Sequence, residues 1–150
     1  MLLRRWGADA YDDGVGRALW FAAGEPTRVR RSVEAFTSPR RPALWSGVGL
    51  AASYAGGVTD EDLQELKRAA SVNATRLAVG AAFAARTRAF GGNPADHTDR
   101  ACRVFCGASA VDAAGIADAC IAEAHGTRDP FRRCIELLTL CFDAGATGCL

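Results

Sequence analysis

An internal repeat constrains this chain more than any other feature. Residues 14–24 and 47–57 echo one another at an offset of 33 residues, and the matching positions carry glycine, valine, alanine and aromatic residues. A fixed period in the low thirties is typical of stacked helical hairpins, in which each unit buries its apolar face against its neighbours. The repeat therefore predicts an architecture and indicates no particular reaction.

Eight helices are expected from the apolar spacing and from the residues that begin and end helices. The first helices of successive pairs are predicted over about residues 8–23, 38–54, 72–90 and 109–125. Their partners begin at Pro26, Asp60, Pro94 and Pro130, a spacing near 34 residues. No segment shows the alternation of a half-buried strand. We therefore predict an all-α fold of about eight helices, arranged as four stacked hairpins of roughly 33–34 residues.

Glycine precedes an aromatic residue in three of the first helices, where the small residue lets backbones approach and the ring fills space between hairpins. These pairs are Gly16 with Trp20, Gly49 with Tyr54, and Gly80 with Phe83. The pattern is loosely similar to tetratricopeptide repeats, whose opening is matched by Trp45 and Gly49, although Tyr54 falls two positions late. We predict TPR-like packing without membership in that repeat family, and burial of Trp45 between hairpins.

The composition argues against several classes of protein. With 150 residues, of which 49% are hydrophobic, the chain is expected to form one domain over residues 1–150 with its own core. A formal net charge of +1 gives no general case for binding nucleic acid. No signal peptide and no apolar run of membrane-spanning length is visible, so we expect a cytoplasmic protein without a membrane span.

Residues 47–52 fit the dinucleotide fingerprint G-x-G-x-x-A. That fingerprint needs a preceding strand, because the pyrophosphate binds where a strand turns into a helix. Residues 41–46 instead have an early proline and helical spacing. We therefore expect these glycines to serve helix packing, and we expect no cofactor.

The six cysteines all lie in the C-terminal third of the chain. Cys102 and Cys106 share one helical face with His97 upstream, so a cluster of three metal ligands is conceivable. Structural zinc sites usually show tighter cysteine pairs in two sets, so we expect reduced, packed thiols and no metal. Neither His97 nor His125 stands at a spacing from serine or cysteine that indicates a catalytic triad.

Four segments carry a resemblance to a known family: residues 11–21, 40–57, 79–86 and 97–102. They resemble the UnbL-like proteins of bacterial enediyne polyketide biosynthesis, an uncharacterised family that is also described as domain of unknown function 1702. Members of that family are about twice as long, and the chain resembles their C-terminal half. The resemblance implies a pathway, and it carries over no catalytic residues.

Two functions remain open at this point. The first is an accessory protein that binds a pathway protein or a hydrophobic polyene, because repeat stacks present concave binding faces. The alternative is an enzyme that modifies the polyene in a pocket between hairpins. Convergence of the candidate residues on one concavity would favour a ligand site, and scatter would favour a scaffold. The candidate residues are Arg17, Arg40, Arg41, Trp45, Tyr54, Arg86 and His97.

Arginines are concentrated between residues 28 and 41, next to Trp45. Arginine and tryptophan are favoured anchors in protein interfaces, so we expect this segment to contact a pathway partner. Charge reversal at Arg40 and Arg41 is expected to weaken that association and to leave the helical fold intact.

Overall fold

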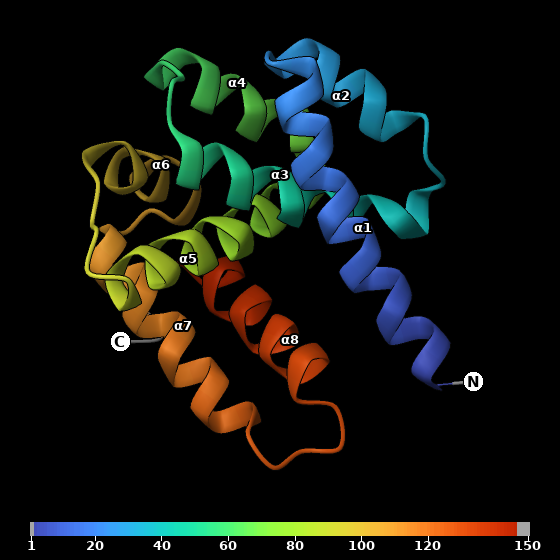
Figure 1. Ribbon diagram of the computed structural model, residues 1–150, viewed down its shortest axis with the longest axis vertical. Helices are drawn as coiled ribbons and strands as arrows, with labels where there is room; N and C mark the ends of the chain where they lie inside the picture. Colours follow the sequence, from blue (N-terminus) through green and yellow to red (C-terminus); the bar gives the residue numbers. More distant parts are fainter. Residues whose placement is uncertain (1, 147–150) are drawn as a thin grey trace.

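The computed structural model of the chain describes the backbone of residues 2–146 and the side chains of residues 7–146. This part of the chain contains helices and turns and no strand (Figure 1), which confirms the predicted all-α fold. The elements in chain order are α1 (Leu2–Ala23), α2 (Pro26–Glu34), the 3-10 helix η1 (Ser38–Arg40), α3 (Arg41–Ala55), α4 (Asp60–Ala70), the 3-10 helix η2 (Ser71–Asn73), α5 (Ala74–Phe90), α6 (Asp96–Cys106), α7 (Ala110–Ala124) and α8 (Pro130–Asp143).

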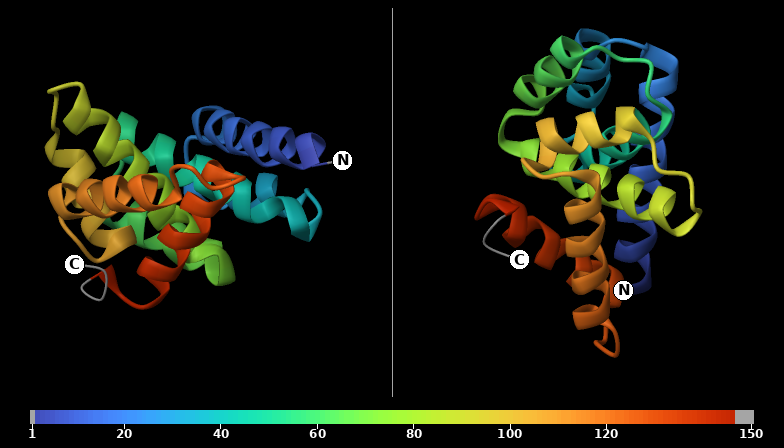
Figure 2. Two further views of the ribbon diagram at one scale, coloured as in Figure 1. Left: turned by 90° about the horizontal axis from the view of Figure 1, so that it is seen from below. Right: turned by 90° about the vertical axis from the view of Figure 1, so that its left-hand side faces the viewer.

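The long helices α1, α3 and α5 pack side by side at the centre of the protein, and α7 packs against α5. Helices α2, α4 and α6 contact one another in that order and form a second layer (Figure 2). Helix α8 packs on α5 and α7, on the side of α5 away from α2 and α4. The stack of four equivalent hairpins stays a prediction, because α8 does not continue the layer of α2, α4 and α6.

Glycines let the backbones of the three central helices touch. A Cβ atom added at Gly16 of α1 would lie 2.0 Å from the carbonyl oxygen of Leu44 in α3. A Cβ added at Gly80 of α5 would lie 2.0 Å from the carbonyl oxygen of Ser46, on the other side of α3. Because protein interiors are close-packed, any side chain at these two positions would force the helices apart.

The glycines of the dinucleotide-like sequence take part in the same packing. Gly47 faces α1, where an added Cβ would lie 1.9 Å from the carbonyl oxygen of Asp13. Gly49 faces α5, where an added Cβ would lie 2.4 Å from the carbonyl oxygen of Leu77. Both glycines lie in the middle of α3, with helix rather than strand before them. This segment of α3 therefore packs closely against two neighbouring helices, α1 on one side and α5 on the other.

The aromatic residues that the sequence singled out differ in burial. Trp20 and Trp45 are buried, with 5% and 2% of their surface exposed, as predicted for Trp45. Tyr54 is 37% exposed, so the prediction that its ring fills the space between hairpins is wrong. The guanidinium of Arg88 instead lies 4.3 Å from the centre of the Tyr54 ring, in a cation–π contact on the surface.

Four predicted helix starts, at Pro26, Asp60, Ser109 and Pro130, are confirmed, and four differ: α1 begins earlier than predicted, and α3, α5 and α6 begin two or three residues later. Thr59 opens α4 in a capping box, Ser109 caps α7, and Asp129 caps α8 before its first-turn proline. Helix α6 begins at Asp96 rather than at Pro94. The cap expected at Asn93 is absent as well, because Ala95 precedes α6 and no side chain caps its first turn.

None of the described helices is by itself both long and apolar enough to cross a membrane. Helices α6 and α7 meet that test only as a joined pair, which is bent by 67° at the break. In α6, Ala101, Cys102 and Phe105 are buried in the core of the protein.

Candidate functional site

Two adjoining cavities lie between α8 and the row of α1, α3 and α5. The first has a volume of about 150 Å³ and the second about 270 Å³. Asp13, Phe131 and Ile135 line both, and we call the two cavities together the α1–α8 groove. Small-molecule sites usually have volumes of roughly 300–1,000 Å³. Neither cavity alone has such a volume, but the two cavities together do. The other lining residues are Asp9, Ala43, Ser46, Arg76, Arg132 and Glu136 in the first cavity, and Ala10, Arg17, Leu50, Phe83 and Thr87 in the second.

The groove runs along the axes of the central helices. On α3, Ser46 lines the first cavity and Leu50 lines the second. On α5, Arg76 lines the first cavity and Phe83 lines the second. Seven residues of α-helix rise about 11 Å, so the two ends of the groove are separated by about two helical turns. The groove is therefore elongated rather than round.

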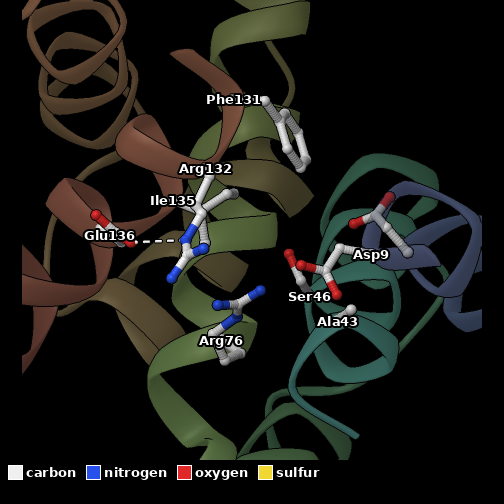
Figure 3. Close-up of a pocket in the computed structure, with 9 residues that line it drawn as sticks. Asp9, Ala43, Ser46, Arg76, Phe131, Arg132, Ile135 and Glu136 are labelled. Carbon is white, nitrogen blue, oxygen red and sulfur yellow. Dashed lines mark hydrogen bonds and ion pairs between the residues drawn. The ribbon is translucent and has the colours of Figure 1, made fainter. Parts of the chain in front are cut away.

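The walls change in character along this length. Charged side chains surround the first cavity, from Asp9 on α1 to Arg132 and Glu136 on α8 (Figure 3). Apolar side chains dominate the second, where Leu50, Phe83 and the shared α8 residues face one another. The groove therefore offers one charged end and one largely apolar end.

Asp13 lies where the two cavities meet. Its Oδ2 is 2.9 Å from Nη2 of Arg17, and the hydroxyl of Ser46 donates a hydrogen bond to its carboxylate. Burial raises the pKa of the Asp13 carboxyl above its ordinary value, and the charge of Arg17 together with these hydrogen bonds opposes the rise. Ser46 is only 3% exposed, so its hydroxyl positions Asp13 more readily than it meets a ligand.

Arg76 is the cation of the first cavity that lacks a close partner. Its Nε atom is inaccessible to solvent and has no hydrogen-bond partner among the described residues. Figure 3 shows its guanidinium between the residues of α3 and those of α8. Burial lowers the pKa of Arg76, whereas the charges of Asp9 and Asp13 raise it. Since arginine stays protonated in proteins, the cavity holds a half-buried cation whose Nε donor is unused.

Arg132 differs from Arg76 although both line the first cavity. Its Nε lies 2.9 Å from Oε1 of Glu136, one helical turn further along α8. This pair satisfies the guanidinium within its own helix. Arg76 is therefore better placed than Arg132 to bind an external anion.

Among the predicted site residues, Arg17 alone lines the groove. Trp45 is part of the core, and Arg86 of α5 pairs with Asp118 of α7 at 2.6 Å. The structure therefore does not bring Arg17, Trp45 and Arg86 to one concavity.

Arg40 and Arg41 attach the connection between α2 and α3 to the rest of the protein. Nη2 of Arg40 lies 2.5 Å from Oδ1 of Asp12, a carboxylate with only 5% of its side chain exposed. Arg41 donates hydrogen bonds of 2.9 Å to the carbonyl oxygens of Phe36 and Glu34. Charge reversal would place a carboxylate beside Asp12 and remove these bonds, so we no longer expect it to leave the fold undisturbed.

Tyr54 and His97 meet at the end of α3, away from the groove. Nε2 of His97 lies 2.9 Å from the carbonyl oxygen of Tyr54, and Arg88 donates to the same oxygen at 2.6 Å. The His97 ring also packs on Gly56, where an added Cβ would lie 2.7 Å from the ring and where φ is +72°. These contacts hold the turn between α3 and α4.

Four cysteines are free and buried, as predicted for them: Cys102, Cys106, Cys120 and Cys134. The thiols of Cys102 and Cys106 donate to carbonyl oxygens of α5, and in the described part of the chain no three His, Cys, Asp or Glu side chains gather as metal ligands. Cys141 is disulfide-bonded, so the expectation of a reduced thiol is wrong there. Cys149 lies outside the described residues.

Arg76, Phe131 and Ile135 are among the groove residues that the sequence did not single out for a site. One signal was present: Arg76 is a charged residue beside a long run of apolar residues in α5, from Leu77 to Ala82. Nothing in the sequence placed α8 across the groove from α1, because the repeat predicts a different side for the last helix. The groove therefore follows from the position of α8.

The fold and the groove define an all-α protein with a candidate ligand-binding site. The sequence model of the family described as Protein of unknown function (DUF1702) matches residues 3–132, and the chain belongs to this family. The matched range includes the parts of α1, α3 and α5 that line the groove. No curated protein and no solved structure gives a significant match.

Proposed function

We propose that this chain is a cytoplasmic accessory protein of bacterial enediyne polyketide biosynthesis and binds an elongated, largely apolar polyene intermediate in the α1–α8 groove. The resemblance to UnbL-like proteins supports the pathway. The shape of the groove supports the class of ligand. The observation that carries the proposal is the change from charged to apolar walls along one elongated depression.

The side chains in the groove favour binding over conversion of the ligand. General acid–base catalysis needs a group that exchanges protons near the working pH, most often histidine. The groove contains no histidine, cysteine or lysine among its lining residues. Two of its carboxylates, Asp13 and Glu136, are held by Arg17 and Arg132 at 2.9 Å. The alternative, an enzyme that modifies the polyene, would depend on Asp13, whose pKa is raised by burial but whose carboxylate is bound by Arg17.

A producing strain that lacks the gene tests the pathway and the groove together. Ala10 lines the larger cavity, so an indole ring in Ala10→Trp would fill it, whereas Ala22 is exposed on the same helix outside the groove. We expect the wild-type gene and Ala22→Trp to restore enediyne production and Ala10→Trp to fail. Unchanged production in the deletion strain would refute the pathway.

Conversion is tested separately with purified protein and a linear polyene acid. The proposal predicts that the mass of the polyene is unchanged after prolonged incubation. Catalytic turnover by the purified protein would instead support the enzyme alternative.

A further inference from the structure

We propose that Arg76 binds the carboxylate of an elongated acid whose apolar chain lies in the second cavity of the groove. This inference rests on the proposed function, because it names the end group by which the groove recognises its ligand. It predicts both the class of ligand and its direction, with the acid toward the start of α5 and the chain toward Phe83.

The position of Arg76 requires a partner. The residue lies in the first turn of α5, and its guanidinium faces the first cavity between α3 and α8 (Figure 3). Its Nε atom is shielded from water and has no hydrogen-bond partner among the described residues. The charges of Asp9 and Asp13 partly offset the burial of this half-buried guanidinium, but the Nε donor still lacks an acceptor, which a bound carboxylate would supply.

A carboxylate fits this cavity better than a doubly charged group. The planar guanidinium offers two parallel donors that match the two oxygens of a carboxylate. Asp9, Asp13 and Glu136 also line the first cavity, and their charges would repel a phosphate dianion more strongly than a monoanion. The volume of about 150 Å³ accommodates a small end group rather than a large polar one.

The second cavity fixes the rest of the ligand. Arg76 and Phe83 are seven residues apart on α5, so a chain held at both must reach about 11 Å beyond its carboxylate. Leu50, Phe83 and Ile135 line that part of the groove with apolar surface. A long acyl chain, saturated or unsaturated, would bury the apolar surface of these residues, whereas a short hydroxy acid would leave that surface exposed to water.

The test compares cis-parinaric acid, a linear polyene acid with environment-sensitive fluorescence, with the corresponding polyene alcohol. Both are titrated into the wild type, Arg76→Gln and Arg30→Gln, each checked by thermal melting. Arg30→Gln removes one positive charge from α2, where Arg30 is paired with Glu34 at 3.0 Å, outside the groove. It therefore separates a local contact from the general electrostatic effect of a lost charge.

We expect the wild type and Arg30→Gln to bind the acid about tenfold or more tightly than the alcohol. Arg76→Gln is expected to lose this preference and to bind the alcohol as the wild type does. If Arg76→Gln does not fold, Arg76→Lys keeps the charge without the planar fork, and its preference for the acid is expected to fall.

Three results would overturn the assignment. Equal binding of acid and alcohol by the wild type would leave the groove as a binding site but remove the role of Arg76. The same conclusion follows if the folded Arg76 variant keeps the full preference for the acid. Absence of binding by both probes would overturn the proposed function as well as the inference.

Discussion

Replacement of Gly16 by alanine tests the packing on which the groove depends. The new Cβ would lie 2.0 Å from the carbonyl oxygen of Leu44, far inside ordinary contact distance, and the obstructing atom belongs to the backbone of α3. Overpacking costs about 1–3 kcal/mol, and a backbone obstacle places the cost near about 3 kcal/mol. Alanine regains about 1 kcal/mol of helix propensity. The free energy of unfolding should therefore fall by about 2 kcal/mol.

Gly14→Ala is the matched control, because Gly14 lies in the same helix with nothing within 4 Å of an added Cβ. Denaturant titration and thermal melting measure both variants. Gly16→Ala should melt about 4–8 °C below the wild type, and Gly14→Ala should be as stable as the wild type or up to about 1 kcal/mol more stable. The packing argument fails if Gly16→Ala is as stable as Gly14→Ala.

Three further predictions concern stability and reactivity. Trp45→Ala should cost about 3–5 kcal/mol, because a buried ring is deleted; unchanged melting would contradict this. The hydrogen bond from the Ala110 N–H lowers the pKa of Asp99 below its ordinary value of 3.8, and the nearby Arg103 lowers it further by a smaller amount. The wild type should therefore exceed Asp99→Asn in melting temperature above that pH, and the gap should close as pH falls through the lowered pKa. Burial raises the pKa of Cys134 to about 11, so iodoacetamide at about pH 8 should label it, by mass spectrometry, only after unfolding.

The central packing of the fold could be predicted from local sequence signals. Gly16, Gly49 and Gly80 were expected to mark close helix approach, and each faces a neighbouring backbone at 2.4 Å or less for an added Cβ. The cap at Ser109 is also local, because its hydroxyl meets the N–H of Asp112 in the same turn. Helix caps depend on residues a few positions apart, and close helix contacts depend on a small side chain. Both features can therefore be predicted from the sequence without knowledge of the fold.

The groove could not be predicted in the same way. It depends on which side of α5 is covered by α8, and that arrangement brings together residues far apart in the chain, such as Arg76 and Phe131, which line the same cavity. The predicted site residues were chosen because arginine and aromatic side chains are common in binding surfaces, and not from any knowledge of what each side chain contacts. Arg40 and Arg41 proved to hold the protein's own backbone and carboxylates, which residue type alone does not reveal.

Titration of the purified protein with cis-parinaric acid tests the central claim, that the α1–α8 groove is a ligand site, most directly. Ala10→Trp fills the larger cavity, and Ala22→Trp adds the same ring to an exposed position of the same helix. The account predicts one saturable site in the wild type and in Ala22→Trp, and loss of that site in Ala10→Trp with the melting temperature retained. Equal binding by folded Ala10→Trp and the wild type would contradict it.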